Sequence, residues 1–187
     1  MKKFQSKITF ILSMLILLTA CFAVVSCGDE SAKSIDDTAA VNDILDDILA
    51  KFPDAPAGSN FYSDSADDSE YFDSIIGPTE YGDGFVLPEL DATDSYAVFV
   101  PEAKSTFNIA VFKSKTDADT ATIKTMLEAK VTAMQNNPQI KAYDDEKGTM
   151  QTMANNGKVY TAGKYVIMLI TSDNDAAVNA AEAKLLK

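Results

Sequence analysis

Apolar residues recur three and four positions apart in two long parts of the chain, and this spacing predicts helices. The first pattern begins at Ile35 and ends at Pro53, with aspartates on its polar side. The second covers residues 117–136, where Thr116 and Asp119 have the spacing of a capping box. Both helices have one apolar face, so each is expected to pack on a core.

Alternation with a period of two predicts strands in the second half of the chain. The alternating segments pair into two hairpins, and a final alanine-rich helix is expected to start near Ser172 and Asp175. The six apolar residues of 165–170 indicate an interior strand covered on both faces or lying beneath a helix. The expected strands are residues 95–100, 106–112, 158–161 and 165–170, with a short additional strand at 150–154.

Residues 54–90 have no clear period and are rich in Pro, Gly, Asp and Ser, so they are expected to form an irregular acidic connection with a short helical turn at 69–76. The predicted order is helix, irregular segment, β-β-α, β-β-α. This order favours an α+β fold, in which an antiparallel sheet of about four strands packs against helices on one face.

The first 27 residues have the features of an export signal. Lys2, Lys3 and Lys7 precede an apolar run from Ile8 to Leu18. An uncleaved anchor is the alternative, because residues 8–25 are close to the shortest length that spans a bilayer. In either case, the N-terminal positive charges place the rest of the chain outside the cytoplasm.

The end of this signal resembles the lipobox of bacterial lipoproteins, in which a cysteine receives a diacylglycerol and becomes the mature first residue. Cys27 follows Val24, Val25 and Ser26 and is the expected lipid attachment site. Cys21 is the alternate site, but cleavage there would leave an apolar stub at the mature terminus. We therefore expect attachment to the cell membrane through lipidated Cys27.

The predicted domain organisation follows from this cleavage. Residues 1–26 form the lipoprotein signal peptide, 27–38 a polar tether, and 39–187 a single α+β domain. Within that domain, 39–90 hold the first helix and the irregular acidic segment, and 91–187 hold the sheet and helix core. A lipidated Cys27 would be the sole mature cysteine, so the core must be stable without an internal disulfide.

Composition excludes several classes of chemistry. The 187 residues include no His, and all 16 positively charged side chains are lysines, against 28 acids. Catalytic triads and zinc sites that need His are therefore excluded. A net charge of −12 argues against binding to nucleic acid, whose phosphates attract cations. We expect no cofactor and no catalytic residue.

Three segments of the second half resemble a known family. They are the strand 96–100, the segment 108–113 that leads into an Asp-containing helix start, and the late segment 163–170. With the lipobox, they resemble the domain-of-unknown-function lipoproteins numbered four-three-five-eight, found mainly in anaerobic Gram-positive bacteria. The resemblance covers residues 85–187 and departs from the family at Lys164, where Asn is common. It implies a lipoprotein setting and no assigned activity.

The remaining candidate chemistry rests on carboxylates and tyrosines. Paired carboxylates could hydrolyse glycosidic bonds, but the sequence selects no pair. Acidic clusters could bind calcium, although none has the spacing of a calcium-binding loop. Exposed tyrosines could form a partner surface, with packing on the sheet as the alternative. The acidic clusters are Asp64, Asp67, Asp68 and Glu70; Asp144, Asp145 and Glu146; and Asp173 and Asp175; the tyrosines are Tyr62, Tyr71 and Tyr81.

These observations favour a lipid-anchored extracytoplasmic protein that is a binding or envelope-structural module and not an enzyme. Its expected partners are the membrane, through the lipidated cysteine, and an envelope protein or small ligand. The alternatives are a carboxylate-based hydrolase of envelope polymers and a calcium-dependent adhesion module.

Overall fold

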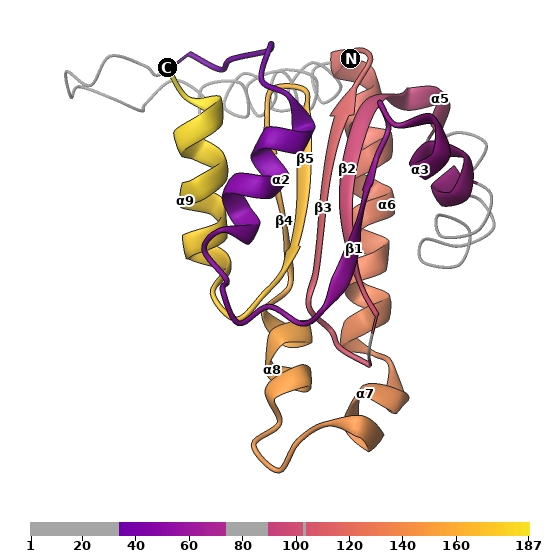
Figure 1. Cartoon of the computed structure of the whole chain (residues 1–187), viewed down its shortest axis with the longest axis vertical. Coiled ribbons are helices and arrows are strands. Elements are labelled where there is room, and N and C mark those ends of the chain that lie inside the picture. The colour runs from indigo at the N-terminus through magenta and orange to yellow at the C-terminus, as the bar shows by residue number, and fades with distance from the viewer. Residues whose placement is uncertain (1–33, 74–89, 103) are drawn as a thin grey trace, which may run out of the picture. The chain divides into compact units, whose positions relative to one another are not determined.

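The computed structural model describes residues 34–73, 90–102 and 104–187, whose helices and strands are drawn in Figure 1. The elements are α2 (Val41–Leu49), β1 (Gly58–Tyr62), α3 (Ala66–Tyr71), α5 (Leu90–Ala92), β2 (Thr93–Pro101), β3 (Asn108–Ser114), α6 (Asp117–Gln135), α7 (Pro138–Tyr143), α8 (Thr149–Asn156), β4 (Lys158–Ala162), β5 (Tyr165–Ile170) and α9 (Asn174–Leu185). Within these described residues, no helix has both the length and the hydropathy that crossing a bilayer requires.

The strands form one five-stranded sheet in the order β1-β2-β3-β5-β4, and every neighbouring pair is antiparallel. The two predicted hairpins, β2-β3 and β4-β5, join through their second strands, so that β3 and β5 lie at the centre (Figure 1). The α+β class and the antiparallel sheet predicted from the sequence are confirmed. The sheet has five strands, where about four were expected.

The fifth strand, β1, lies in the segment expected to be irregular. It pairs with β2 from Gly58 opposite Pro101 to Tyr62 opposite Ala97. Phe61 is the one residue of β1 that is buried, because β1 is an edge strand. The segment therefore shows little hydrophobic alternation. Gly58 is needed where it stands, since a Cβ there would lie 2.6 Å from the carbonyl oxygen of Val100 and would clash with the Phe99 ring.

Helices cover both faces of the sheet, and the expectation of one covered face is wrong. Figure 1 shows α2 and α9 across one face and α6 along the other. The physical reason lies in the central strands, where residues pointing both ways are apolar. All six residues of β5 are buried, as the uninterrupted run 165–170 indicated.

The two cores alternate along each strand. Odd-numbered residues of β3 and β5, such as Ile109 and Ile167, pack beneath α2 and α9. Even-numbered residues, such as Phe112 and Met168, pack beneath α6. In the second core Tyr96 lies between two aromatic rings, with centroids 4.7 Å from Phe72 and 5.7 Å from Phe112.

Side-chain caps fix the starts of the long helices. The capping box predicted for α6 is present, with reciprocal hydrogen bonds between Thr116 and Asp119. The final helix begins one residue later than the sequence suggested. Asp173, rather than Ser172, is its N-cap and accepts hydrogen bonds from the backbone N–H of Asp175 and Ala176.

Two short helices connect α6 to β4. The prediction of a strand at 150–154 is therefore wrong. Asn137 caps α7, in which Pro138 takes the first helical position. Residues 150–154 instead belong to α8. The carboxylate of Asp144 accepts the backbone N–H of Met150 at 2.7 Å and of Gln151 at 2.8 Å, which favours a helical start over a strand.

The segment before α2 is bound to the end of the chain. Ile35 and Leu186 form an isolated antiparallel bridge, and Ser34 exchanges two backbone hydrogen bonds with Lys187. Residues 34–38, which belong to the expected tether 27–38, are therefore part of the folded domain. The helix expected from Ile35 begins at Val41.

Candidate functional site

The expected lipid attachment site lies outside the described residues. Cys27 and the alternate Cys21 belong to residues 1–33, as does the whole predicted signal peptide 1–26. The prediction of a lipid anchor therefore continues to rest on the sequence.

The acidic clusters singled out in the sequence make structural contacts. Asp145 accepts hydrogen bonds from the backbone and hydroxyl of Thr149, which lower the pKa of its carboxyl. Asp64 accepts both hydrogen bonds of the Asn42 amide, and Asp175 pairs with Lys158 at 2.6 Å. In the described part of the chain, no three carboxylates come together in a way that could hold a metal ion.

The tyrosines of the predicted partner surface are described only in part. The half-buried Tyr62 packs against the core beneath α2, and its hydroxyl donates to Asp46 at 3.1 Å. This is the packing alternative considered for these residues. The side chain of Tyr71 and the whole of Tyr81 lie outside what the structure describes.

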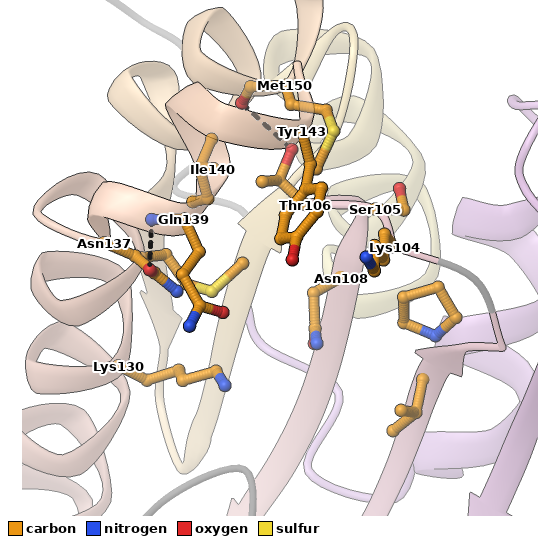
Figure 2. Close-up of a pocket in the computed structure, with 13 residues that line it drawn as sticks. Lys104, Ser105, Thr106, Asn108, Lys130, Asn137, Gln139, Ile140, Tyr143 and Met150 are labelled. Carbon is orange, nitrogen blue, oxygen red and sulfur yellow. Dashed lines mark hydrogen bonds between the residues drawn. The ribbon is translucent and has the colours of Figure 1, made fainter.

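The structure instead reveals a cavity of about 360 Å³ at one end of the sheet. It lies where the β2–β3 loop meets the last turns of α6 and the short helix α7 (Figure 2). We call it the α7 cavity. The residues that give it its chemistry are Lys104, Thr106, Asn108, Lys130, Gln139 and Tyr143.

Asn108, the first residue of β3, is the most unusual residue of this cavity. It is 3% exposed, and its Oδ1 is the one buried side-chain oxygen or nitrogen of the described residues that lacks a hydrogen-bond partner. Its position faces α6, on the same side of the strand as Ala110 and Phe112, where an apolar residue would be expected. An unpaired buried acceptor costs about 1–3 kcal/mol. Oδ1 of Asn108 therefore stands out among the buried polar atoms of the described residues.

Among the described residues that line the cavity, the charged side chains are lysines. Lys104 comes from the β2–β3 loop and Lys130 from α6, and no Asp or Glu is among these described residues. The ammonium of Lys104 lies 3.4 Å from the centre of the Tyr143 ring, a cation–π contact that joins the loop to α7.

Several other polar groups of the cavity already have partners in the fold. The Thr106 hydroxyl donates to the Met150 carbonyl at 3.0 Å, and the Asn137 Oδ1 accepts from the Gln139 backbone at 2.9 Å. The first contact holds α8 against the β2–β3 loop, and the second caps α7. Figure 2 shows the side chains of Asn108, Gln139 and Lys130 extending into the same space.

A second cavity, of about 320 Å³, lies near the end of α2. Ser105 lines both cavities, since the β2–β3 loop runs between them. The second cavity is lined mainly by Phe52, Phe107 and neighbouring prolines, and Asp54 is the one acid among its described lining residues. The described lining of neither cavity therefore contains the pair of carboxylates that a glycoside hydrolase would need.

The described residues whose pKa values are shifted do not line the α7 cavity. Burial raises the pKa of Tyr165 to about 12, and Asp37 and Asp36 add to the shift; its hydroxyl donates to the Ala39 carbonyl at 2.7 Å. Burial and a hydrogen bond to Glu182 raise the pKa of Tyr160 to about 12. These shifts report structural hydrogen bonds and identify no acid–base pair.

Comparisons with known proteins give no match: no family model, no curated protein and no solved structure matches this chain. The site is therefore interpreted from its own geometry.

Proposed function

We propose that this protein is a lipid-anchored, extracytoplasmic binding module whose ligand site is the α7 cavity. Cys27 would hold the lipid, with Cys21 as the alternate site. The folded domain would present the cavity outside the cell membrane. The lipobox supports the location, and the resemblance to the four-three-five-eight lipoproteins agrees with it. The cavity supports the binding role.

The observation that carries the binding role is the unpaired Oδ1 of Asn108 at a cavity large enough for a small molecule. Buried acceptors are nearly always paired, so an unpaired one needs an explanation. A ligand that donates a hydrogen bond would supply the missing partner. Concave sites with a few convergent polar groups are typical of ligand binding.

The membrane setting suits such a module. A diacyl anchor holds a protein stably, since each buried methylene contributes about 0.8 kcal/mol. Removal of Lys2, Lys3 and Lys7 with the signal peptide would change the net charge from −12 to −15. Anionic lipids repel such a domain over about 8 Å, which keeps it away from the surface. Residues 28–33 would provide the spacing.

Two observations place binding ahead of the alternatives. A hydrolase that uses two carboxylates finds no such pair among the described residues that line either cavity. A calcium-dependent adhesion module would need clustered oxygen ligands. Asp144 and Asp173 instead accept backbone N–H groups at helix starts, and Asp175 pairs with Lys158. The role proposed here involves no catalysis and no cofactor.

The anchor is tested by metabolic labelling with a fatty-acid analogue in cells that express the full chain. Cys27→Ser should abolish the label, and Cys21→Ser should retain it. Label that survives Cys27→Ser and is lost in Cys21→Ser would move the site to Cys21. Absence of label from the unmodified chain would overturn the lipid anchor.

The binding role is tested separately by NMR on a soluble form that begins at Gly28 and retains all the described residues. Small molecules that bind the α7 cavity should shift the amide signals of Asn108 and Gln139. Signals of β4, which lies at the far edge of the sheet, serve as the internal control. A varied set of small molecules that leaves the cavity signals unmoved would overturn the binding role.

A further inference from the structure

We infer that the folded domain stands on the membrane with one defined end toward the lipid surface and with the α7 cavity at the opposite end. We call the first of these the anchor end; it comprises residues 34–36, 115, 163–164 and 186–187. This inference rests on the proposed lipid anchor. It adds the surface of the domain that faces the bilayer.

The chain enters the folded domain at Ser34, and the structure holds this point in place. The N–H of Ser34 donates to the Lys187 carbonyl at 3.2 Å, and the N–H of Lys187 donates to the Ser34 carbonyl at 2.9 Å. Two residues later, the N–H of Asp36 donates to the carbonyl of Leu185 at 2.7 Å. The point at which the predicted anchor joins the domain is therefore fixed beside the C-terminal end of α9.

The turn between β4 and β5 lies at the same end of the domain. A Cβ at Gly163 would lie 3.3 Å from the Cδ1 and Cγ2 atoms of Ile35, so the two residues are neighbours. The next residue, Lys164, donates from its Nζ to the Lys115 carbonyl at 3.2 Å. Lys115 follows the end of β3. The anchor end is thus one connected set of contacts between four segments of the chain.

Strand β3 runs from the α7 cavity to the anchor end. Its first residue, Asn108, lines the cavity, and the N–H of its last residue, Ser114, donates to the Lys164 carbonyl at 2.9 Å. At about 3.4 Å per residue, this strand spans about 20 Å. Figure 1 shows the end of the chain and α7 at opposite ends of the sheet. The length of a central strand therefore separates the cavity from the anchor end.

Covalent connection limits how far the anchor end can move from the membrane. Residues 28–33 separate Cys27 from Ser34. A polypeptide spans at most 3.3–3.6 Å per residue, so Ser34 stays within about 25 Å of Cys27 in any conformation of these residues. The lipid on Cys27 would hold that residue at the bilayer surface. This limit applies to the anchor end and not to the cavity.

Repulsion from the bilayer acts on the whole domain, whereas the anchor holds it at Ser34. The mature chain would have a net charge of −15, because cleavage removes three lysines and no acid. Anionic lipids repel this charge over about 8 Å, and the bilayer itself excludes a folded domain. The energy is lowest when the held end is nearest to the lipids and the rest of the domain is farthest away. This is the orientation with the α7 cavity on the side away from the membrane.

The test measures fluorescence energy transfer from a dye on the protein to acceptor lipids. It uses the full lipidated chain in vesicles of phosphatidylethanolamine and phosphatidylglycerol. Ala118 and Ala133 are exposed residues near the start and the end of α6, fifteen positions apart, and therefore about 22 Å apart along the helix. Because transfer falls steeply with distance, Ala118→Cys should transfer several-fold more strongly than Ala133→Cys.

A second pair of sites, on other elements, checks the same order. Thr161 is an exposed residue near the β4–β5 turn, and Lys147 is an exposed residue between α7 and α8. Thr161→Cys should transfer more strongly than Lys147→Cys. A Gly/Ser stretch inserted into residues 28–33 should lower the transfer from Ala118→Cys, because a longer connection lets Ser34 move farther from the lipids.

The unmodified chain is the control for dye attachment. The sulfur of a lipidated Cys27 forms a thioether, and Cys21 would be removed with the signal peptide, so this chain should take up no thiol-reactive dye. Dye uptake by the unmodified chain would place a free thiol in the mature protein. That result would overturn the limit that residues 28–33 set.

The outcomes separate the orientation from the anchor. Equal transfer within both pairs, from chains that carry the fatty-acid label, would overturn the orientation and leave the lipid anchor in place. Stronger transfer from Ala133→Cys than from Ala118→Cys would place the cavity end against the bilayer and would also overturn it. Chains that carry no fatty-acid label and do not stay with the vesicles would overturn the anchor, and the orientation with it.

Discussion

The Nζ of Lys187 lies 2.7 Å from Oδ2 of Asp36, so the last residue of the chain is bound to the segment that leads into α2. Asp36 also accepts hydrogen bonds from the backbone N–H and the hydroxyl of Thr38. These contacts, first the hydrogen bond from Lys187 and then those from Thr38, lower the pKa of Asp36 to about 2. They join the N-terminal and C-terminal ends of the folded domain beside the bridge between Ile35 and Leu186.

The stabilisation from Asp36 should therefore depend on pH. Because its folded pKa lies below its unfolded value of 3.8, it stabilises the fold above about pH 4, and the contribution disappears as pH falls toward 2. Asp36→Asn should lower the melting temperature at pH 7. Thermal melts should show the difference between the unmodified chain and this variant shrinking between pH 4 and pH 2.

Glu146→Gln serves as the control for this series. Glu146 is exposed, and its removal should change the melting temperature little at any pH. A gap between Asp36→Asn and the unmodified chain that stays constant down to pH 2 would contradict the role given to the Asp36 carboxylate.

Most of the fold could be predicted from the sequence, in the segments where burial makes apolar residues recur at a regular spacing. Strands β2, β3, β4 and β5 were predicted because alternate residues enter two apolar cores. Strand β1 was missed because it is an edge strand with one buried residue. Helix α8 was mistaken for a strand because the side chains that start it, above all Asp144, act through hydrogen bonds that spacing alone does not reveal.

The α7 cavity was not predicted from the sequence, and the reason differs from that for β1 and α8. Lys104, Lys130 and Gln139 belong to three elements that meet only when the sheet and helices pack together. One local signal was present, since Asn108 is a polar residue at the start of an apolar strand. Such a residue indicates a ligand site only once its burial and lack of a partner are known.

The N-terminus of α9 gives a prediction about a single side chain. Asp173 accepts two backbone hydrogen bonds at 3.1 and 2.9 Å, so Asp173→Ala should destabilise the protein by about 1 kcal/mol. This corresponds to a fall of about 2–4 °C in melting temperature. Ser172→Ala, one residue earlier, should have a smaller effect, and the reverse order would assign the cap to Ser172.

Tyr165 gives a prediction at alkaline pH. Its buried hydroxyl donates to the Ala39 carbonyl, so Tyr165→Phe should cost about 1 kcal/mol at neutral pH. The pKa of Tyr165 is raised to about 12, and the protein should therefore lose stability as pH rises from 10, where the unfolded tyrosine ionises, toward 12. Denaturant titrations of Tyr165→Phe should show a smaller loss over this range. An equal loss in both proteins would assign the alkaline sensitivity to other groups.

Asn108 links the stability of the domain to its proposed role, and its replacement should change the two in opposite directions. In Asn108→Leu, a side chain of similar size removes the unpaired acceptor from the core beneath α6, so the ligand-free domain should gain about 1 kcal/mol and melt about 2–4 °C higher. The same variant should lose binding at the α7 cavity, because the oxygen proposed to accept the ligand's hydrogen bond is gone. Asn108→Asp, which places an unpaired charge in the same position, should destabilise the domain. Differential scanning calorimetry measures the stability of Asn108→Leu and Asn108→Asp against the unmodified chain. If Asn108→Leu were less stable than the unmodified chain, Asn108 would have a structural partner in the folded protein.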